Sequence, residues 1–214
     1  PSRDRQHGRI YRVTYEGREP SQPPKIAGEP VKNLLDLLLH PEDRVRYRAK
    51  IELGGRDTKE VLDAANTWLA LWTKQHADNK FPDEDFEHAR LEALWLYQYH
   101  NVVNPGLLKE VLASPDFRAR AAAVRVLNAW RDRVPDALEL LKAAAADDHP
   151  RVRLMAVWAA SYFPVPEAAE VVFVAQDRPT DRYLDYLIGQ TMRALDPLVK
   201  RAIAEKRPIK FTTP

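Results

Sequence analysis

Histidine is the residue type that could bind a metal or transfer protons here, and the chain has six of them. His76, His88 and His100 follow one another at intervals of 12 residues, and none forms a His-x-x-x-His or Glu-x-x-His pair on one helix face. The chain has no cysteine, which excludes disulfides, thiolate metal sites, catalytic thiols and covalent haem attachment. A Ser-His-Asp or paired-carboxylate arrangement cannot be derived either, because helical spacing alone does not place distant residues within hydrogen-bond reach. We therefore expect no metal, no cofactor and no catalytic site in this chain.

Arginine is the second residue type that could do chemistry, because a row of guanidinium groups can bind phosphate. Seven arginines recur in three short segments: Arg44, Arg46, Arg48, Arg118, Arg120, Arg151 and Arg153. Acidic residues are interleaved with them, and 33 basic against 31 acidic residues leave a formal net charge of only +2. We therefore interpret these arginines first as structural, and keep a phosphate-binding groove as the alternative.

The arginines belong to a repeat that also contains a proline and a small residue. The four matches span residues 41–49, 82–93, 115–123 and 150–156, and they end on small residues 44, 30 and 33 residues apart: Ala49, Ala93, Ala123 and Ala156. A further step of 33 residues reaches Gly189. Each match opens a predicted helix, and an amphipathic helix is expected before each one, at residues 31–40, 58–77, 104–113, 135–146 and 166–176, with a closing helix at 196–206. Antiparallel helix pairs at such a period indicate an α-solenoid.

An arginine stands three positions before each small residue and is expected to tie one repeat to the next. Proline at the first turn favours helix initiation, and the small residue lets the two helices of a pair cross closely. The predicted ladder consists of Arg46, Arg90, Arg120 and Arg153 with acidic residues at the preceding turn, Asp43, Asp116 and Asp148. This pattern is of the HEAT type. The sequence therefore predicts an all-α, HEAT-type solenoid of about five helical hairpins over residues 31–206.

The first 30 residues differ from the rest, with five of the 17 prolines and three of the seven glycines. Residues 9–15 alternate in the manner of a β-strand, and residues 20–24 resemble an extended polyproline-like linker. We therefore divide the chain into a terminal strand with its Pro-rich linker (1–30), the solenoid (31–206) and a C-terminal tail or linker (207–214). Because no initiator Met is present, we expect a processed chain or a fragment of a longer protein.

Five short segments carry a resemblance to a known family: residues 7–15, 91–95, 100–103, 130–138 and 183–186. They resemble the central part of large secreted proteins of planctomycete-type bacteria, known as membrane-bound dehydrogenases or haem-binding proteins. In that family a β-propeller precedes a HEAT-repeat segment and a cytochrome c domain usually follows. The resemblance implies that residues 7–15 form the last propeller strand and that the parent protein is exported, so that this segment faces the periplasm or the exterior. The propeller body and the Cys-x-x-Cys-His haem motif are missing from this sequence.

Aromatic and polar side chains gather at the ends of two neighbouring predicted helices. Most of the aromatic residues are expected to pack between repeats. The candidates for partner binding are Trp95, Gln98, Tyr99, His100, Asn101 and Asn104 at one end, and Arg131, Asp132 and Arg133 at the equivalent end of the next repeat. Because successive repeats place equivalent ends side by side, we expect these residues to form one rim of the solenoid.

Three hypotheses about function follow from these observations. The first is a noncatalytic scaffold that binds protein partners, either the propeller and cytochrome domains of the parent or another subunit. The second is a nucleic-acid-binding protein, including a base-excision enzyme, that uses the repeat arginines on phosphates. The third is an enzyme with its active site near residues 7–30, which only the propeller resemblance favours. No apolar run approaches the length of a membrane-spanning helix, so no membrane insertion is expected.

Overall fold

The computed structural model describes residues 7–8, 11, 13, 15–17, 22–78, 80 and 82–211, and in that part of the chain every regular element is helical. The elements in chain order are α1 (Val31–Asp36), η1 (Leu37–Leu39), α2 (Asp43–Gly54), α3 (Thr58–Ala77), α4 (Asp83–Tyr99), α5 (Pro105–Leu112), α6 (Phe117–Ala129), α7 (Ala137–Ala145), α8 (Pro150–Ala160), η2 (Pro166–Ala168), α9 (Ala169–Gln176) and α10 (Arg182–Ala204). No helix of this set is long and apolar enough to cross a bilayer.

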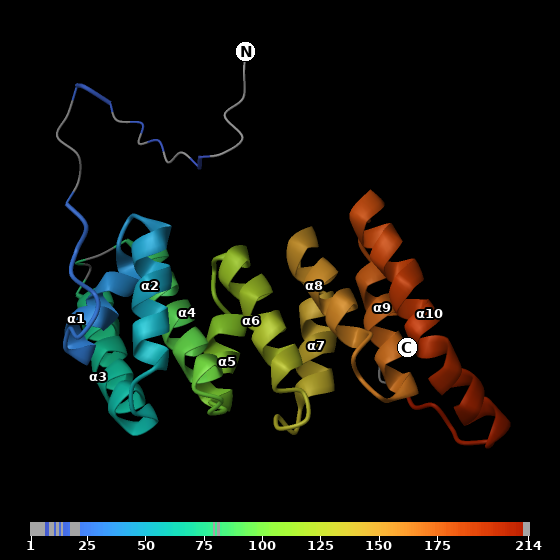
Figure 1. Ribbon diagram of the computed structural model, residues 1–214. Helices are drawn as coiled ribbons and strands as arrows, with labels where there is room; N and C mark the ends of the chain where they lie inside the picture. The colour runs from blue at the N-terminus through green and yellow to red at the C-terminus, as the bar shows by residue number, and fades with distance from the viewer. Residues whose placement is uncertain are drawn as a thin grey trace, which may run out of the picture.

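The helices pair into five hairpins that are stacked in chain order, from α1 and α2 at one end to α9 and α10 at the other (Figure 1). The second helices of the hairpins (α2, α4, α6, α8 and α10) each contact the next, which gives the array one continuous layer of parallel helices. The predicted all-α solenoid of about five hairpins is therefore confirmed. Each repeat buries its apolar face only against its neighbours, as expected for a stacked array.

The small residues of the repeat are buried within the array. Ala49, Ala93, Ala123 and Ala156 are each at most 1% exposed. A larger side chain at any of these four positions would have to displace neighbouring atoms, which agrees with the predicted role of a small residue in helix packing. Gly189 does not continue the series. It is half-buried, whereas the buried positions of α10 include Leu184, Thr191 and Leu195.

Two further predictions about helices need correction. The closing helix expected at 196–206 is the second half of α10, which runs without a break from Arg182 to Ala204. Pro197 lies inside α10 on its exposed side, so the carbonyl that loses a backbone partner can be solvated by water. Among the second helices of the hairpins, proline occupies the first turn only in α8. α4 begins after Pro82, and α6 begins after Asp116, whose carboxylate accepts from the Arg118 N–H.

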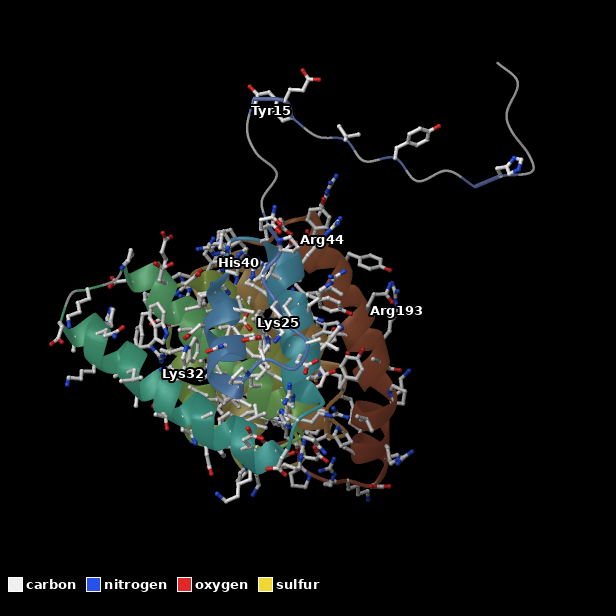
Figure 2. The ribbon with its side chains drawn as sticks, turned by 60° about the vertical axis from the view of Figure 1, so that its left-hand side comes forward. Tyr15, Lys25, Lys32, His40, Arg44 and Arg193 are labelled. Atoms are coloured by element: carbon white, nitrogen blue, oxygen red, sulfur yellow. The ribbon has the colours of Figure 1, made fainter. Side chains whose placement is uncertain are left out.

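The strand predicted for residues 9–15 falls partly outside the described residues, which include Tyr11, Val13 and Tyr15 of that segment. These three residues belong to no regular element and are strongly exposed. Tyr15 lies apart from the helices, whereas His40 and Arg44 mark one end of α2 (Figure 2). The end of the predicted linker does contact the array: the Gly28 N–H donates to Glu52 Oε1 at 3.2 Å, and Arg56 donates to the Glu29 carbonyl.

Candidate partner-binding surface

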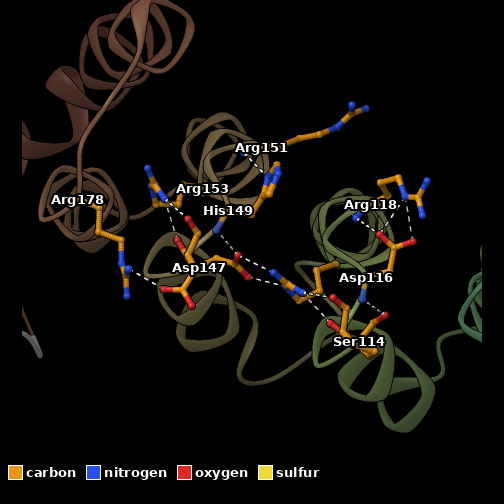
Figure 3. Close-up of polar contacts among 11 residues, drawn as sticks. Ser114, Asp116, Arg118, Asp147, His149, Arg151, Arg153 and Arg178 are labelled. Atoms are coloured by element: carbon orange, nitrogen blue, oxygen red, sulfur yellow. Dashed lines mark hydrogen bonds and ion pairs between the residues drawn. The ribbon is translucent and has the colours of Figure 1, made fainter. Parts of the chain in front are cut away.

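The repeat arginines hold the turns between the two helices of each hairpin. Arg46 Nη1 donates to the carbonyls of His40 and Pro41, at 2.6 and 3.0 Å. Arg120 Nη1 makes the same two bonds six and five residues back, to Ser114 and Pro115. Arg153 repeats the arrangement on Asp147 and Asp148, at 3.0 and 2.9 Å (Figure 3). These arginines therefore satisfy carbonyls of the turn that would otherwise lack a donor.

Two of these arginines also reach the next repeat. Arg120 forms a two-pronged ion pair with Asp147, with Nε at 2.7 Å from Oδ2 and Nη2 at 2.9 Å from Oδ1. Arg153 Nη2 donates to the carbonyl of Pro179 at 2.7 Å. A ladder from repeat to repeat is thus present. Its acceptors are an aspartate and a carbonyl of the following turn rather than acids of the same turn.

The predicted acidic partners of the ladder were wrong. Asp116 caps α6 and pairs with Arg118, both oxygens lying 3.0 Å from its Nε. The carboxylate of Asp148 pairs with Arg178 at 2.6 Å (Figure 3). Asp43 lies in the first turn of α2, where its charge suits the positive end of the helix dipole, and its side chain makes no contact with Arg46. These acids are close to the arginines in the sequence, but in the fold the carbonyls of the turns lie closer to the guanidinium groups.

Arg90 departs from the pattern of the other three arginines. Its Nη1 donates to Glu87 on the same helix at 2.9 Å, and its Nη2 lies 3.8 Å from Glu110. Arg90 is the eighth residue of α4, whereas Arg46, Arg120 and Arg153 are each the fourth residue of their helices. Arg90 therefore lies about one helical turn further from the preceding turn, and its guanidinium does not reach the carbonyls there.

The Arg120–Asp147 pair makes the stability of the fold sensitive to acid. Burial alone would raise the pKa of Asp147, but hydrogen bonds from Arg120 and the His149 N–H outweigh burial and hold the pKa below its ordinary value of 3.8. A carboxylate whose pKa is lower in the folded state stabilises the fold above the ordinary value and loses this contribution as the pH falls through the folded-state value. We expect the unfolding free energy to decrease below about pH 4.

Urea unfolding between neutral and acidic pH tests this expectation. Asp147→Asn should flatten part of the acid dependence, because the amide does not titrate. The matched control is Asp132→Asn, since Asp132 is exposed and makes no side-chain contact with any residue that the structure describes. An Asp147→Asn protein with the same acid slope as the wild type would contradict the assignment.

A hollow on the layer of second helices lies over α6. Trp95 and Gln98 on α4 form one wall and Trp158 on α8 the other, with a volume of about 440 Å³ between them. The floor comes from α6, through Ala122, Arg125, Asn128 and Ala129. We call these seven residues the central groove. A second hollow of about 290 Å³ adjoins it across Trp95, lined also by Lys50 and Tyr99.

The walls of the central groove are held by their neighbours. Lys50 Nζ lies 4.2 Å from the ring centroid of Trp95 and pairs with the buried carboxylate of Glu92 at 2.8 Å. Trp158 packs edge-on against Tyr162, with ring centroids 5.2 Å apart. Both indoles are therefore fixed in place before any partner arrives, which reduces the entropy that binding would cost.

The residues predicted for the rim fall into two sets. Trp95, Gln98 and Tyr99 line the hollows. The others lie on the same edge of the array, after the C-terminal ends of α4 and α6, but most of them form contacts between or within repeats. Those contacts are His100 with Thr58, Asn101 with Arg133, Asn104 as the cap of α5, and Arg131 with the Tyr162 carbonyl, while Asp132 is exposed. The predicted residues that line the hollows therefore all come from the last turns of α4, while Asn101, Asp132 and Arg133 are exposed beside the contacts between repeats.

Sequence reasoning missed five residues of the central groove, among them Arg125, Asn128 and Trp158. The signal was present in the repeat register. The residues two positions after the four small residues are Ile51, Trp95, Arg125 and Trp158. The residues five positions after Ala93, Ala123 and Ala156 are Gln98, Asn128 and Ser161. Equivalent positions of stacked repeats form rows across the array. Aligning the repeats at their small residues therefore brings both tryptophans and Arg125 into one row.

The histidines are explained by local structure. The Nδ1 atoms of His40 and His149 accept from the backbone N–H two residues later, Glu42 and Arg151, at 3.1 and 3.2 Å. Both side chains therefore stabilise the turn that precedes a second helix. Within the described part of the chain, no group of three or more His, Asp or Glu side chains is arranged to hold a metal ion.

Comparison with known proteins bears on the second half of the array. Residues 104–193 match the family model of HEAT repeats, from the cap of α5 to the middle of α10. No curated protein and no solved structure matches the chain at a significant level. The stacked hairpins, the arginine ladder and this match together identify residues 104–193 as HEAT repeats, a class of repeat that generally serves as a scaffold for protein interactions.

Proposed function

We propose that this chain is a noncatalytic protein-interaction module that binds a partner along its second helices, at the central groove. The observation that carries the proposal is the placement of Trp95 and Trp158. Both are only partly buried, and they border opposite sides of a hollow whose floor is formed by α6. Large aromatic side chains that border an open hollow are typical of binding surfaces, where they supply contact area at low entropic cost.

A protein partner fits this surface better than a nucleic acid does. Backbone phosphates require a continuous row of cations. The row of exposed arginines at the start of the second helices is interrupted on α4, where Glu84 and Asp85 occupy the surface between Arg44 and Arg118. Arg118 is itself neutralised by Asp116. This distribution of charge would repel a phosphate chain at the middle of the array.

The resemblance of the sequence supports a narrower version of the proposal. On that version the module joins a propeller and a cytochrome domain of an exported dehydrogenase, in the periplasm or outside the cell. The exposed N-terminal residues Tyr11, Val13 and Tyr15 would then pair with the propeller. A longer protein containing all three parts, in which this segment contacts both neighbours, would support that version.

Selection of binding peptides tests the general proposal. Random dodecapeptides displayed on phage are selected on the full chain, and the affinity of the best binders is measured by fluorescence anisotropy. Ala129→Trp fills the groove and should weaken binding about tenfold or more. The matched control is Ala70→Trp on α3, also an exposed helical alanine, which should change little. Failure to select any binder, or binders insensitive to Ala129→Trp, would contradict the proposal, as would stoichiometric haem in the purified chain.

A further inference from the structure

A third hollow lies on the same layer of second helices. It has a volume of about 350 Å³, lies between the beginnings of α4 and α6, and is lined by Glu84, Asp85 and Glu87 of α4, by Asp116 in the turn before α6 and by Arg118 of α6. The central groove is lined by the later turns of the same helices. Because α4 and α6 are parallel and in contact, the two hollows follow one another along the same pair of helices. We call the hollow at the beginnings of these helices the acidic hollow, and the acidic hollow and the central groove together the trough.

The two ends of the trough carry opposite charge. In the central groove, Arg125 is exposed and makes no hydrogen bond or ion pair with any residue that the structure describes. The other arginines of α6 are engaged, Arg118 with Asp116 and Arg120 with Asp147. Lys50 is likewise neutralised by Glu92. Arg125 is therefore a cation of the groove whose charge is left for a ligand, and its planar fork matches a carboxylate.

The acidic hollow offers the complementary charge. The carboxylates of Glu84 and Asp85 are exposed and form no ion pair at contact distance within the described chain. Glu87 is only 4% exposed, and its Oε2 accepts no hydrogen bond, although its Oε1 binds Arg90. A buried carboxylate oxygen without a donor is unfavourable, and a basic group entering the hollow would relieve it.

The floor of the groove holds a second unsatisfied group. Asn128 is 7% exposed, and its Oδ1 accepts no hydrogen bond. Buried amide oxygens are satisfied in almost all folded proteins, so an orphaned one beside a hollow indicates a missing donor. A peptide backbone N–H is such a donor. Trp95 and Trp158 on the two walls provide apolar faces for a large side chain of the same peptide.

We infer that the trough between α4 and α6 binds an extended peptide segment of a partner protein that carries one acidic and one basic side chain. The acidic side chain pairs with Arg125, an apolar side chain lies between Trp95 and Trp158, and the basic side chain lies in the acidic hollow. This inference rests on the proposed interaction function and names the chemistry of its partner.

The spacing of the acidic and the basic residue in the peptide follows from the distance along α4 between the acidic hollow and the row of Arg125. Asp85 precedes Trp95, which shares the row of Arg125, by ten residues. Ten residues correspond to about 15 Å along the helix axis. An extended chain covers this length in about four to five residues. The peptide is therefore expected to carry its acidic and basic residues four or five positions apart, with an apolar residue near the acid.

The test is a charge swap on the full chain. Dodecapeptides selected from the random library should share the pattern of an acid and a base at that spacing. The best one, labelled with fluorescein, should bind Arg125→Glu about tenfold or more weakly, and the same peptide with Lys in place of its acid should regain affinity for Arg125→Glu. Arg151→Glu is the matched control, because Arg151 is an exposed arginine of the neighbouring second helix whose side chain extends away from the ion pairs (Figure 3).

The outcomes separate this inference from the general proposal. If peptides bind the Ala129→Trp protein more weakly but bind the Arg125→Glu protein as well as the wild type, the pairing of Arg125 with an acidic peptide residue is wrong. The general proposal of a protein-interaction module is then still supported. Enrichment of peptides without the paired charges would have the same meaning. If a 20-nucleotide single-stranded DNA displaced the peptide with steep salt dependence, the partner class would be wrong. Far-UV circular dichroism checks that each variant is folded.

Discussion

Lys142→Met is expected to destabilise the fold by about 3–5 kcal/mol, because it leaves a buried carboxylate without its cation. Lys142 on α7 is 8% exposed, and its Nζ lies 2.5 Å from Oε2 of Glu170 on α9. Glu170 is fully buried, whereas the second partner of Lys142, Glu139, is largely exposed. The loss is large beside the total stability of a domain, which is about 5–15 kcal/mol.

Urea unfolding followed by far-UV circular dichroism measures this loss. Lys109→Met is the matched control. Lys109 pairs with Asp136 at 2.7 Å, but both side chains are about half exposed, so the cost should stay below about 1 kcal/mol. The double variant Lys142→Met/Glu170→Met should recover most of the loss, because it removes the unpaired charge. If the double variant is as unstable as Lys142→Met, the loss comes from packing and the electrostatic explanation is wrong.

Arg120→Ala is expected to lower the free energy of unfolding by about 2–4 kcal/mol. It removes the two hydrogen bonds to the carbonyls of the turn and leaves the partly buried carboxylate of Asp147 without its cation. The Arg120 side chain is 18% exposed and that of Asp147 is 12% exposed. Burial disfavours both charges, but their mutual hydrogen bonds outweigh it, raising the pKa of Arg120 and lowering that of Asp147. Since the pair joins α6 to the turn before α8, its loss should also loosen the contact between two repeats.

Arg125→Ala provides the comparison within the same helix. Arg125 is exposed and unpaired within the described chain, so its removal should change the stability by no more than about 0.5 kcal/mol. Hydrogen exchange should show faster opening at the α6–α8 boundary in Arg120→Ala and not in Arg125→Ala. Equal stability of the two variants would mean that the ladder does not hold the repeats together.

The sequence predicted the hairpins because their determinants are local. Periodic apolar residues and the small residue at each crossing act within one or two helical turns, so they can be located without knowledge of the neighbours. Ala49, Ala93, Ala123 and Ala156 were assigned correctly for this reason. The prediction failed at the C-terminus, where a separate closing helix was expected at 196–206; Pro197 lies on the solvent side of α10 and does not interrupt it.

Only the tertiary structure decided which groups the arginines bind and which side chains remain free. Arg120 pairs with Asp147, 27 residues away in the sequence, and not with Asp116, which is nearer in the sequence. The reason is that the turn of the next repeat lies closer to the guanidinium. Arg125 is free for the same kind of reason, since no carboxylate in the described part of the chain lies within ion-pair distance of it. Contacts of this kind depend on how successive hairpins are displaced and rotated. That displacement is set by the packing of whole helices, which no short stretch of sequence encodes.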